Sequence, residues 1–189
     1  FSPFQWAIPN SPFIERADGV VVLPIWGCMN AEDGFQRLDS NGLIRSTDGG
    51  KTWGNPSIIA YDKEHRRSCY NEGGIAVMDD DVWVIFMRTE YRDVGNEGAW
   101  MSRSVSTDGG NTWSSPELCF IGGVPVVVAL PDGGIAVGAS GGLHFTYDLG
   151  RTWTRVAPEG GYVNPILLDE NRSLRRQLNA KPAAGGTGQ

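Results

Sequence analysis

Short apolar runs along this chain are separated by acidic and glycine-rich turns, and within several runs apolar and polar residues alternate. This pattern is typical of antiparallel strands. Three stretches each contain two such runs joined by a tight turn: 11–26 turns at Asp18-Gly19, 72–88 turns at 79–81, and 124–140 turns at Asp132-Gly133. The pattern therefore predicts three β-hairpins in an all-β chain.

An eight-residue segment recurs after each predicted hairpin. It reads STDGGKTW from Ser46, STDGGNTW from Ser106 and, in weaker form, TYDLGRTW from Thr146. Asp and Gly suit a tight turn, because the carboxylate accepts hydrogen bonds from backbone amides and glycine tolerates positive φ. The Trp that ends each copy offers apolar area to a core. We interpret these segments, called boxes below, as structural turns without a catalytic role.

Each box lies between a strand-like run that leads into it and another that leaves it, at 55–59, 115–120 and 154–157. Each repeat then contains four antiparallel strands, and 163–169 resembles the start of a fourth repeat. Four-stranded sheets repeated radially are the blades of a β-propeller. We predict about three blades, a partial or half ring, over residues 1–170, and a flexible tail or linker over 171–189.

Composition agrees with a globular protein and excludes several function classes. The chain has 189 residues, of which 40% are hydrophobic, 26 are Gly and 7 are Trp. The net charge of −6 argues against nucleic acid as a partner, because phosphate binding needs a clustered basic face. No apolar run approaches the roughly 20 residues of a membrane-spanning helix. No signal segment precedes Phe1, so the expected chain is processed or cut from a longer one.

The cysteines and histidines give no sign of a metal site. Cys28, Cys69 and Cys119 are widely spaced, so we expect free and mostly buried thiols. His144 stands among apolar residues and is expected to be a core or edge residue of its strand, not a ligand. No second histidine lies at metal-ligand spacing, so we expect neither a metal nor a cofactor.

Strand direction divides each predicted blade into two rims. If the first strand of the second repeat runs from Glu72 to the turn near Asp80, the next returns to Arg88 and the third descends to the box at Ser106. The boxes then share a rim with the hairpin turns, and Glu72 lies directly opposite Arg88 at the other rim. The corresponding pairs in the other repeats are Asn10 with Trp26 and Val124 with Ser140. Only the second repeat thus pairs opposite charges, either as a structural salt bridge or as part of a site.

The box pattern Ser-x-Asp-x-Gly-x-Thr-Trp resembles the Asp-box, or bacterial neuraminidase (BNR) repeat, of the sialidase superfamily, over roughly 7–170. The resemblance implies a six-bladed β-propeller and a glycoside hydrolase of exo-α-sialidase type that acts on terminal acidic sugars of glycans. Asn71-Glu72, an apolar hairpin and Met87-Arg88 are similar to part of the sialidase active site. In that pattern Glu72 accepts the proton of a tyrosine nucleophile and Arg88 binds the sugar carboxylate. The resemblance also implies a secreted or periplasmic location.

The sequence departs from the sialidase pattern in its other active-site positions. Ala7-Ile8-Pro9 replaces the Arg-Ile-Pro motif of the family, and 139–144 contains no arginine where the third is expected. Neither the acid/base aspartate nor the tyrosine is placed, so the catalytic set is incomplete in this chain. The alternative is a non-catalytic propeller module that binds glycan or protein. A longer parent, or a second copy in a homo-oligomer, would complete the ring.

The remaining candidates are polar and aromatic residues. Tyr91 and Arg92 are predicted substrate contacts, with Glu90 as a further polar neighbour. Trp26 and Trp100, together with Tyr91, would either stack on a sugar ring or pack between blades. A glycan or other carbohydrate is the expected partner.

Overall fold

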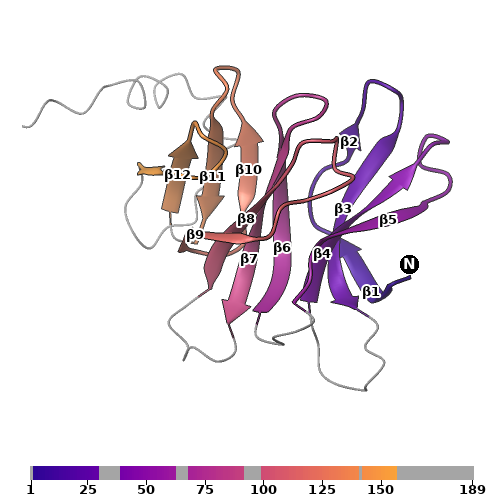
Figure 1. The fold of residues 1–189 in the computed structure, drawn as a ribbon, viewed down its shortest axis with the longest axis horizontal. Helices are drawn as coiled ribbons and strands as arrows, with labels where there is room; N and C mark the ends of the chain where they lie inside the picture. Colours follow the sequence, from indigo (N-terminus) through magenta and orange to yellow (C-terminus); the bar gives the residue numbers. More distant parts are fainter. Residues whose placement is uncertain (1, 30–38, 63–67, 92–98, 141, 157–189) are drawn as a thin grey trace, which may run out of the picture.

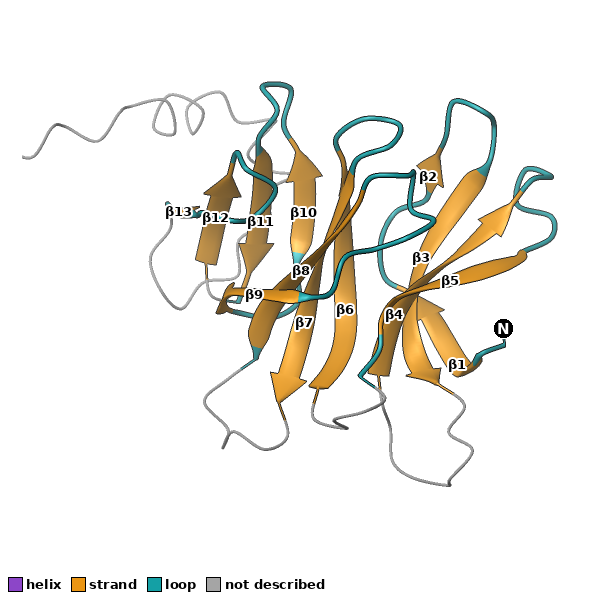
Figure 2. Cartoon of the chain, in the orientation of Figure 1, coloured by secondary structure: helices purple, strands orange, loops and turns teal. Residues whose placement is uncertain are grey.

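A computed structural model describes residues 2–29, 39–62, 68–91, 99–140 and 142–156, and their regular structure is entirely β (Figure 2). The strands are β1 (Phe4–Pro9), β2 (Ile14–Glu15), β3 (Val21–Met29), β4 (Asp39–Ser46), β5 (Gly54–Ala60), β6 (Ser68–Val77), β7 (Trp83–Tyr91), β8 (Trp100–Ser106), β9 (Glu117–Ile121), β10 (Val126–Ala129), β11 (Ile135–Ala139), β12 (Gly142–Thr146) and β13 (Thr154–Arg155). No helix with the length and apolarity of a membrane span occurs in these ranges. The predicted fourth repeat and the tail at 171–189 lie outside them.

The strands form three antiparallel sheets that follow one another along the chain. Their orders are β1-β3-β4-β5, with β2 also paired to β3, then β6-β7-β8-β9, and β10-β11-β12-β13. The sheets stand side by side in chain order (Figure 1), and we call them blades 1, 2 and 3. The prediction of an all-β partial propeller is confirmed.

Blade 2 is buried on both faces, because β7 sends alternate side chains to its two neighbours. Trp83, Ile85 and Met87 pack with residues of blade 1, including Val22 and Leu43. The intervening side chains of β7 pack with blade 3 in a second cluster that contains Val84, Phe86, Ile135, Val137 and Ala139. An uninterrupted apolar run is what a strand with two buried faces requires.

The three boxes share one pattern of hydrogen bonds. In the second box, the Asp108 carboxylate accepts hydrogen bonds from Thr112 N (2.8 Å) and Thr112 Oγ1 (2.6 Å). Ser106 Oγ accepts from Gly110 N at 2.9 Å, and Trp113 Nε1 donates to Gly110 O at 3.2 Å. The same contacts recur around Asp48 and Asp148. These hydrogen bonds account for the conserved spacing within the repeat, as a structural turn predicts.

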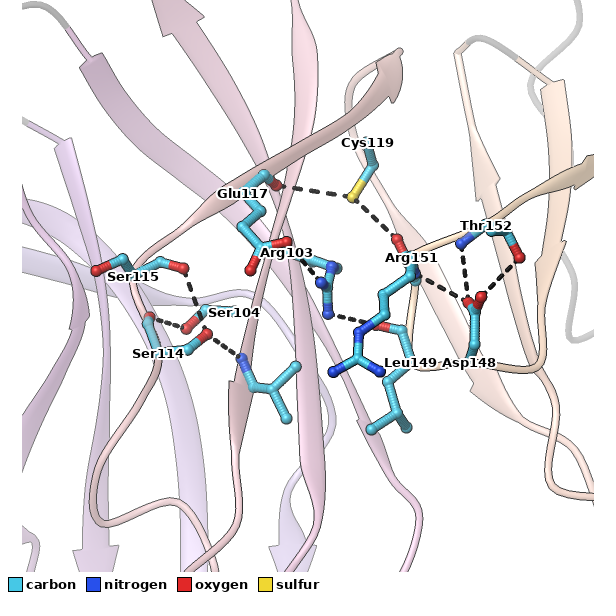
Figure 3. A network of polar contacts seen from close by, with 12 residues as sticks. Arg103, Ser104, Ser114, Ser115, Glu117, Cys119, Asp148, Leu149, Arg151 and Thr152 are labelled. Atoms are coloured by element: carbon cyan, nitrogen blue, oxygen red, sulfur yellow. Dashed lines mark hydrogen bonds and ion pairs between the residues drawn. The ribbon is translucent and has the colours of Figure 1, made fainter.

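Arginines of one blade bind the box of the next. Arg45 of β4 donates to Gly110 O at 2.6 Å, and Arg103 of β8 donates to Leu149 O at 2.9 Å. Figure 3 shows Arg103 between Leu149 and Glu117, whose carboxylate lies 2.6 Å from it. The boxes therefore stabilise the contacts between blades as well as their own turns.

Blade 1 departs from the predicted layout in its first strand. In place of one run from residue 11, two pieces pair with β3: β2, which lies within that run, and β1, which precedes it. Trp26 faces Ile8 and not Asn10, and Asn10 N reaches Pro24 O at 3.4 Å. Pro9 at the end of β1 has no amide hydrogen for a ladder, which is consistent with a break there. In blade 3 the predicted register holds, since Val126 faces Gly138.

Candidate functional site

The Glu72 and Arg88 side chains meet at the rim of blade 2 that lies away from its box. Trp83, at the start of β7, faces Ser106, where the box begins. Arg88, near the other end of β7, faces Met101 on β8 and Asn71 on β6. The box and the hairpin turn therefore share one rim, and the charged pair lies at the opposite one, as strand direction predicts.

The predicted register of this hairpin is wrong by one residue at the site itself. Gly73 faces Met87 as expected, but the next paired residue of β6 is Asn71, which faces Arg88. Glu72 is the extra residue of a β-bulge and has a φ of 22°, in the left-handed region. A bulge of this kind redirects a side chain out of the regular alternation and is common beside functional sites. Register counted residue by residue from the turn cannot reveal the bulge, because all pairs between the turn and Gly73 keep the regular alternation.

Arg88 binds two carboxylates at once. Its Nη1 lies 3.1 Å from Glu72 Oε2, and its Nη2 lies 2.5 Å from Glu90 Oε1. The exposed fractions of the side chains are 31% for Arg88, 24% for Glu72 and 45% for Glu90, so water still reaches all three. Arg88 Nε is buried and has no hydrogen-bond partner in the described ranges. The three groups together carry one net negative charge when all are ionised.

The segment that joins β9 to β10 supports the side chain of Arg88. A Cβ on Gly123 would lie only 3.1 Å from Arg88 Cδ and 3.4 Å from Arg88 Nε, so the side chain of Arg88 rests against a bare backbone. Gly123 N donates to Ser140 Oγ at 2.9 Å, and Ser140 N donates to Gly123 O at 3.0 Å. Ser140, the predicted counterpart of Arg88 in blade 3, thus holds the loop that contacts Arg88. No sequence pattern indicates Gly123, whose role depends on contacts between segments far apart in the chain.

Blade 1 contributes a group of buried polar side chains beside the bulge. Asn41 Nδ2 donates to Tyr70 O at 2.9 Å, and Asn71 Nδ2 donates to Asp39 Oδ2 at 3.4 Å. Asp39, Asn41 and Asn71 are all buried. Sequence reasoning did not find Asp39 and Asn41, because they come from a neighbouring repeat and match no motif.

The other predicted contacts are placed only in part. The backbone of Tyr91 ends β7, opposite Ser68, whereas Arg92 lies outside the described residues. Trp100 begins β8 and faces Thr89. Trp26 lies in blade 1, where its ring meets that of Trp6 edge to face at 5.5 Å. The structure thus brings together Glu72, Arg88 and Glu90. The stacking of aromatic residues on a sugar ring remains a prediction.

Two other titratable groups belong to the interior between blades 2 and 3. His144 is buried, stacks on Phe120 with 3.8 Å between ring centroids, and has a pKa lowered mainly by burial and further by Arg155. Burial raises the pKa of the Cys119 thiol to about 12, so it is not a nucleophile at neutral pH. All three cysteines are free, as expected. No group of three potential metal ligands occurs in the described part of the chain.

Comparisons with known proteins identify the architecture. The sequence matches no model of a known family and no curated protein. The Hadza microbial sialidase Hz136 shares the fold with a TM-score of 0.62 and 19% identity, over 82% of this chain and 38% of that one. A protein of unknown function from Dyadobacter fermentans gives a TM-score of 0.61 and 20% identity, over 82% and 43% of the two chains. An α-L-arabinanase from Penicillium chrysogenum gives 0.53 and 19%, over 80% and 51%.

At these identities the likeness shows the fold alone. The chain is a partial β-propeller with the architecture found in sialidase and arabinanase structures. It spans 43% and 38% of the first two neighbours, which is less than half of either.

Proposed function

We propose that this chain forms part of the substrate-binding rim of a sialidase-like glycoside hydrolase that acts on terminal acidic sugars of glycans. The observation that carries the proposal is the contact of Glu72 with Arg88 at the rim opposite the boxes. Sialidases among the structures of the same fold support it. The resemblance of Asn71-Glu72 and Met87-Arg88 to the family pattern supplies the roles of these residues.

The chemistry assigns one task to each charged group. A guanidinium binds a carboxylate through parallel hydrogen bonds, so Arg88 would hold the carboxylate of the sugar. Glu72 would accept the proton of a tyrosine nucleophile, which makes the phenol reactive near neutral pH. That tyrosine has no counterpart placed among the described residues, and the proposal assigns it to the remainder of the propeller.

Glu90 opposes this use of Arg88. Its carboxylate lies 2.5 Å from Nη2, so a sugar carboxylate must displace it before binding there. Two anions close to one cation also repel a third. We therefore expect Glu90→Gln to tighten the binding of an acidic sugar and to leave the binding of a neutral sugar unchanged.

A second function is favoured by the same arrangement. Arg88 already has two carboxylate partners, and the residues at the family's other arginine positions are Ala7 and a segment without arginine at 139–144. A non-catalytic propeller that binds glycan or protein at this rim would need neither the nucleophile nor three arginines. Binding without turnover distinguishes it from the enzyme.

One preparation, in which a longer parent or a second copy completes the propeller, can test both functions. A fluorogenic aryl sialoside measures hydrolysis, and a glycan array measures binding. For the enzyme we expect Glu72→Gln to lower turnover by about a hundredfold or more. Glu117→Gln is the matched control, because it removes a carboxylate from the 2.6 Å ion pair with Arg103 in the same blade, away from this rim.

The outcomes separate the proposals. Turnover that survives in Glu117→Gln and is lost in Glu72→Gln supports the hydrolase. Glycan binding without turnover, unaffected by Glu72→Ala, supports the module and removes the enzyme. Neither binding nor turnover in the folded, completed propeller contradicts both functions.

A further inference from the structure

The backbone at Glu72 has an unfavourable conformation that something must hold. Glu72 is not glycine, yet its φ is 22°. Residues in such sparsely populated regions persist only where their surroundings fix them. The flanking residues of β6 stay in register with β7, with Asn71 opposite Arg88 and Gly73 opposite Met87. The constraint must therefore act on a very short segment.

Side chains of blade 1 hold the carbonyl groups on both sides of Glu72. Before it, Asn41 Nδ2 donates to Tyr70 O at 2.9 Å and to Asn71 O at 3.3 Å. After it, Asn10 Nδ2 donates to Gly73 O at 2.9 Å. We call Asn10 and Asn41 the carbonyl clamp. Their amides come from two different parts of blade 1, so together they fix the backbone of β6 from outside its own sheet.

The clamp also fills the space above the residue that follows Glu72. A Cβ on Gly73 would lie 2.5 Å from Asn41 Oδ1 and 2.9 Å from Ile85 Cδ1. Asn41 is 2% exposed, so its amide has no room to turn away into water. A buried amide that donates to two carbonyls is costly to remove, because the carbonyls lose their partners. Asn41 and Gly73 thus fit one another closely at the bulge.

We propose that Asn41, assisted by Asn10, is a positioning residue of the site: the carbonyl clamp fixes the bulge that turns Glu72 toward Arg88. The inference deepens the proposed function and rests on it for its purpose, since a held carboxylate matters where Glu72 has a chemical role. The structural part of the inference, that the clamp fixes the backbone at Glu72, does not depend on any sugar. Blade 1 would then set the geometry of a pair that lies wholly in blade 2.

Nuclear magnetic resonance of the ¹⁵N-labelled chain tests the structural content directly. The coupling between the amide and α protons reports φ, and it is small at the φ of Glu72 and large in an extended strand. We expect a small coupling at Glu72 in the wild type and a rise toward the extended value in Asn41→Ala. Asn10→Ala, which removes the less buried half of the clamp, should give a smaller change in the same direction. If Asn41→Ala does not fold, the Glu72 coupling in Asn10→Ala tests the inference.

Ser104→Ala is the matched control for general loosening. Ser104 is also fully buried in blade 2, and its hydroxyl donates to Ser114 O at 2.6 Å. The Glu72 coupling should stay small in this variant. An unchanged coupling in both clamp variants, or an equal change in Ser104→Ala, would overturn the proposal.

Turnover or sugar binding then tests the purpose of the clamp. We expect Asn41→Ala to lower it on the order of tenfold, as misplacement of a reacting group does. In the Glu72→Gln background Asn41→Ala should add no further loss, because the two residues act as one unit. If the wild type neither binds nor cleaves sugars while the coupling still changes as expected, the proposed function fails and the clamp stands.

Discussion

The two rims of the propeller segment differ: the three blades share one structure at the box rim and do not share one at the opposite rim. At the box rim all three blades make the same hydrogen bonds: the Asp carboxylate accepts from the Thr amide, and the Trp indole donates to a Gly carbonyl. At the opposite rim, blade 2 carries the charged pair of Glu72 with Arg88 at a bulge, whereas the predicted counterparts in the other blades, Asn10 with Trp26 and Val124 with Ser140, carry no charge. Repetition there gives way to a unique arrangement, which is what a single binding site on a repeated scaffold requires.

The difference also separates stability from function. The box rim joins blades through partly buried hydrogen bonds such as that of Arg45 with Gly110. The other rim holds partly exposed charges, whose interactions water weakens. Changes at the box rim should therefore affect unfolding, and changes at the site rim should affect ligands.

The largest expected effect comes from a matched pair of glycines in the boxes. Gly110 and Gly50 both have positive φ, at 81° and 87°. A Cβ on Gly110 would lie 2.8 Å from the Trp83 ring and 3.0 Å from Leu43, whereas on Gly50 its nearest neighbour is Trp53 at 3.7 Å. We expect Gly110→Ala to lower the free energy of unfolding by about 3 kcal/mol and Gly50→Ala by about 1 kcal/mol. Urea denaturation measures both.

The pair isolates the packing of the box of blade 2 against Trp83 of the same blade and Leu43 of blade 1, because the backbone penalty is common to the two variants. Equal losses would mean that the box of blade 2 does not press on Trp83 and Leu43 as the structure places it.

A smaller effect is expected from the carboxylate of the second box. Asp108→Ala removes the acceptor of Thr112 N and Thr112 Oγ1, and should lower the free energy of unfolding by about 1 kcal/mol, as the loss of a helix cap does. The hydrogen bonds from Thr112 lower the pKa of Asp108 from 3.8 to about 2. The carboxylate therefore stabilises the fold fully above pH 4 and loses this effect as the pH falls toward 2.

Denaturation curves at pH 7, 4 and 2.5 check this window. The acid-induced loss should be smaller in Asp108→Ala than in the wild type. Hydrolysis or binding of sugar per folded molecule should not change, and a clear change would link the box to the site rim.

The contrast between the rims also explains what the sequence could predict. The boxes repeat along the chain, so Asp48, Asp108 and Asp148 and the strands around them were found by comparing the chain with itself. The bulge at Glu72 occurs once and follows from contacts with Asn41 in another blade, so neither alternation nor repetition indicates it. Nor does the repeat indicate β1, which precedes the run predicted from residue 11.

A still smaller effect concerns the interior of blade 3, which belongs to neither rim. His144 stacks on Phe120, its Nδ1 has no hydrogen-bond partner among the described residues, and its pKa is lowered from 6.5, mainly by burial. The neutral form is thus favoured in the fold, so stability is complete above pH 6.5 and declines as the pH falls toward the lowered pKa. We expect a loss between pH 7.5 and 5 that is smaller than the loss caused by Asp108→Ala.

His144→Phe provides the control, because it keeps a ring against Phe120 and cannot be protonated. Thermal unfolding at the two pH values should then show a smaller difference than in the wild type. An equal difference would assign this pH dependence to groups other than His144.

The smallest expected effect on stability is at the site itself. Glu72→Gln keeps the shape of the side chain and removes one of the two carboxylates on Arg88, which retains Glu90. Because Glu72 and Arg88 are 24% and 31% exposed, we expect the free energy of unfolding to change by about 0.5 kcal/mol or less. Urea denaturation beside the sialoside assay tests this combination. A cost as large as that of Gly110→Ala would make the pair a structural salt bridge, whereas a near-zero cost together with lost turnover or binding means that the carboxylate serves the ligand and not the fold.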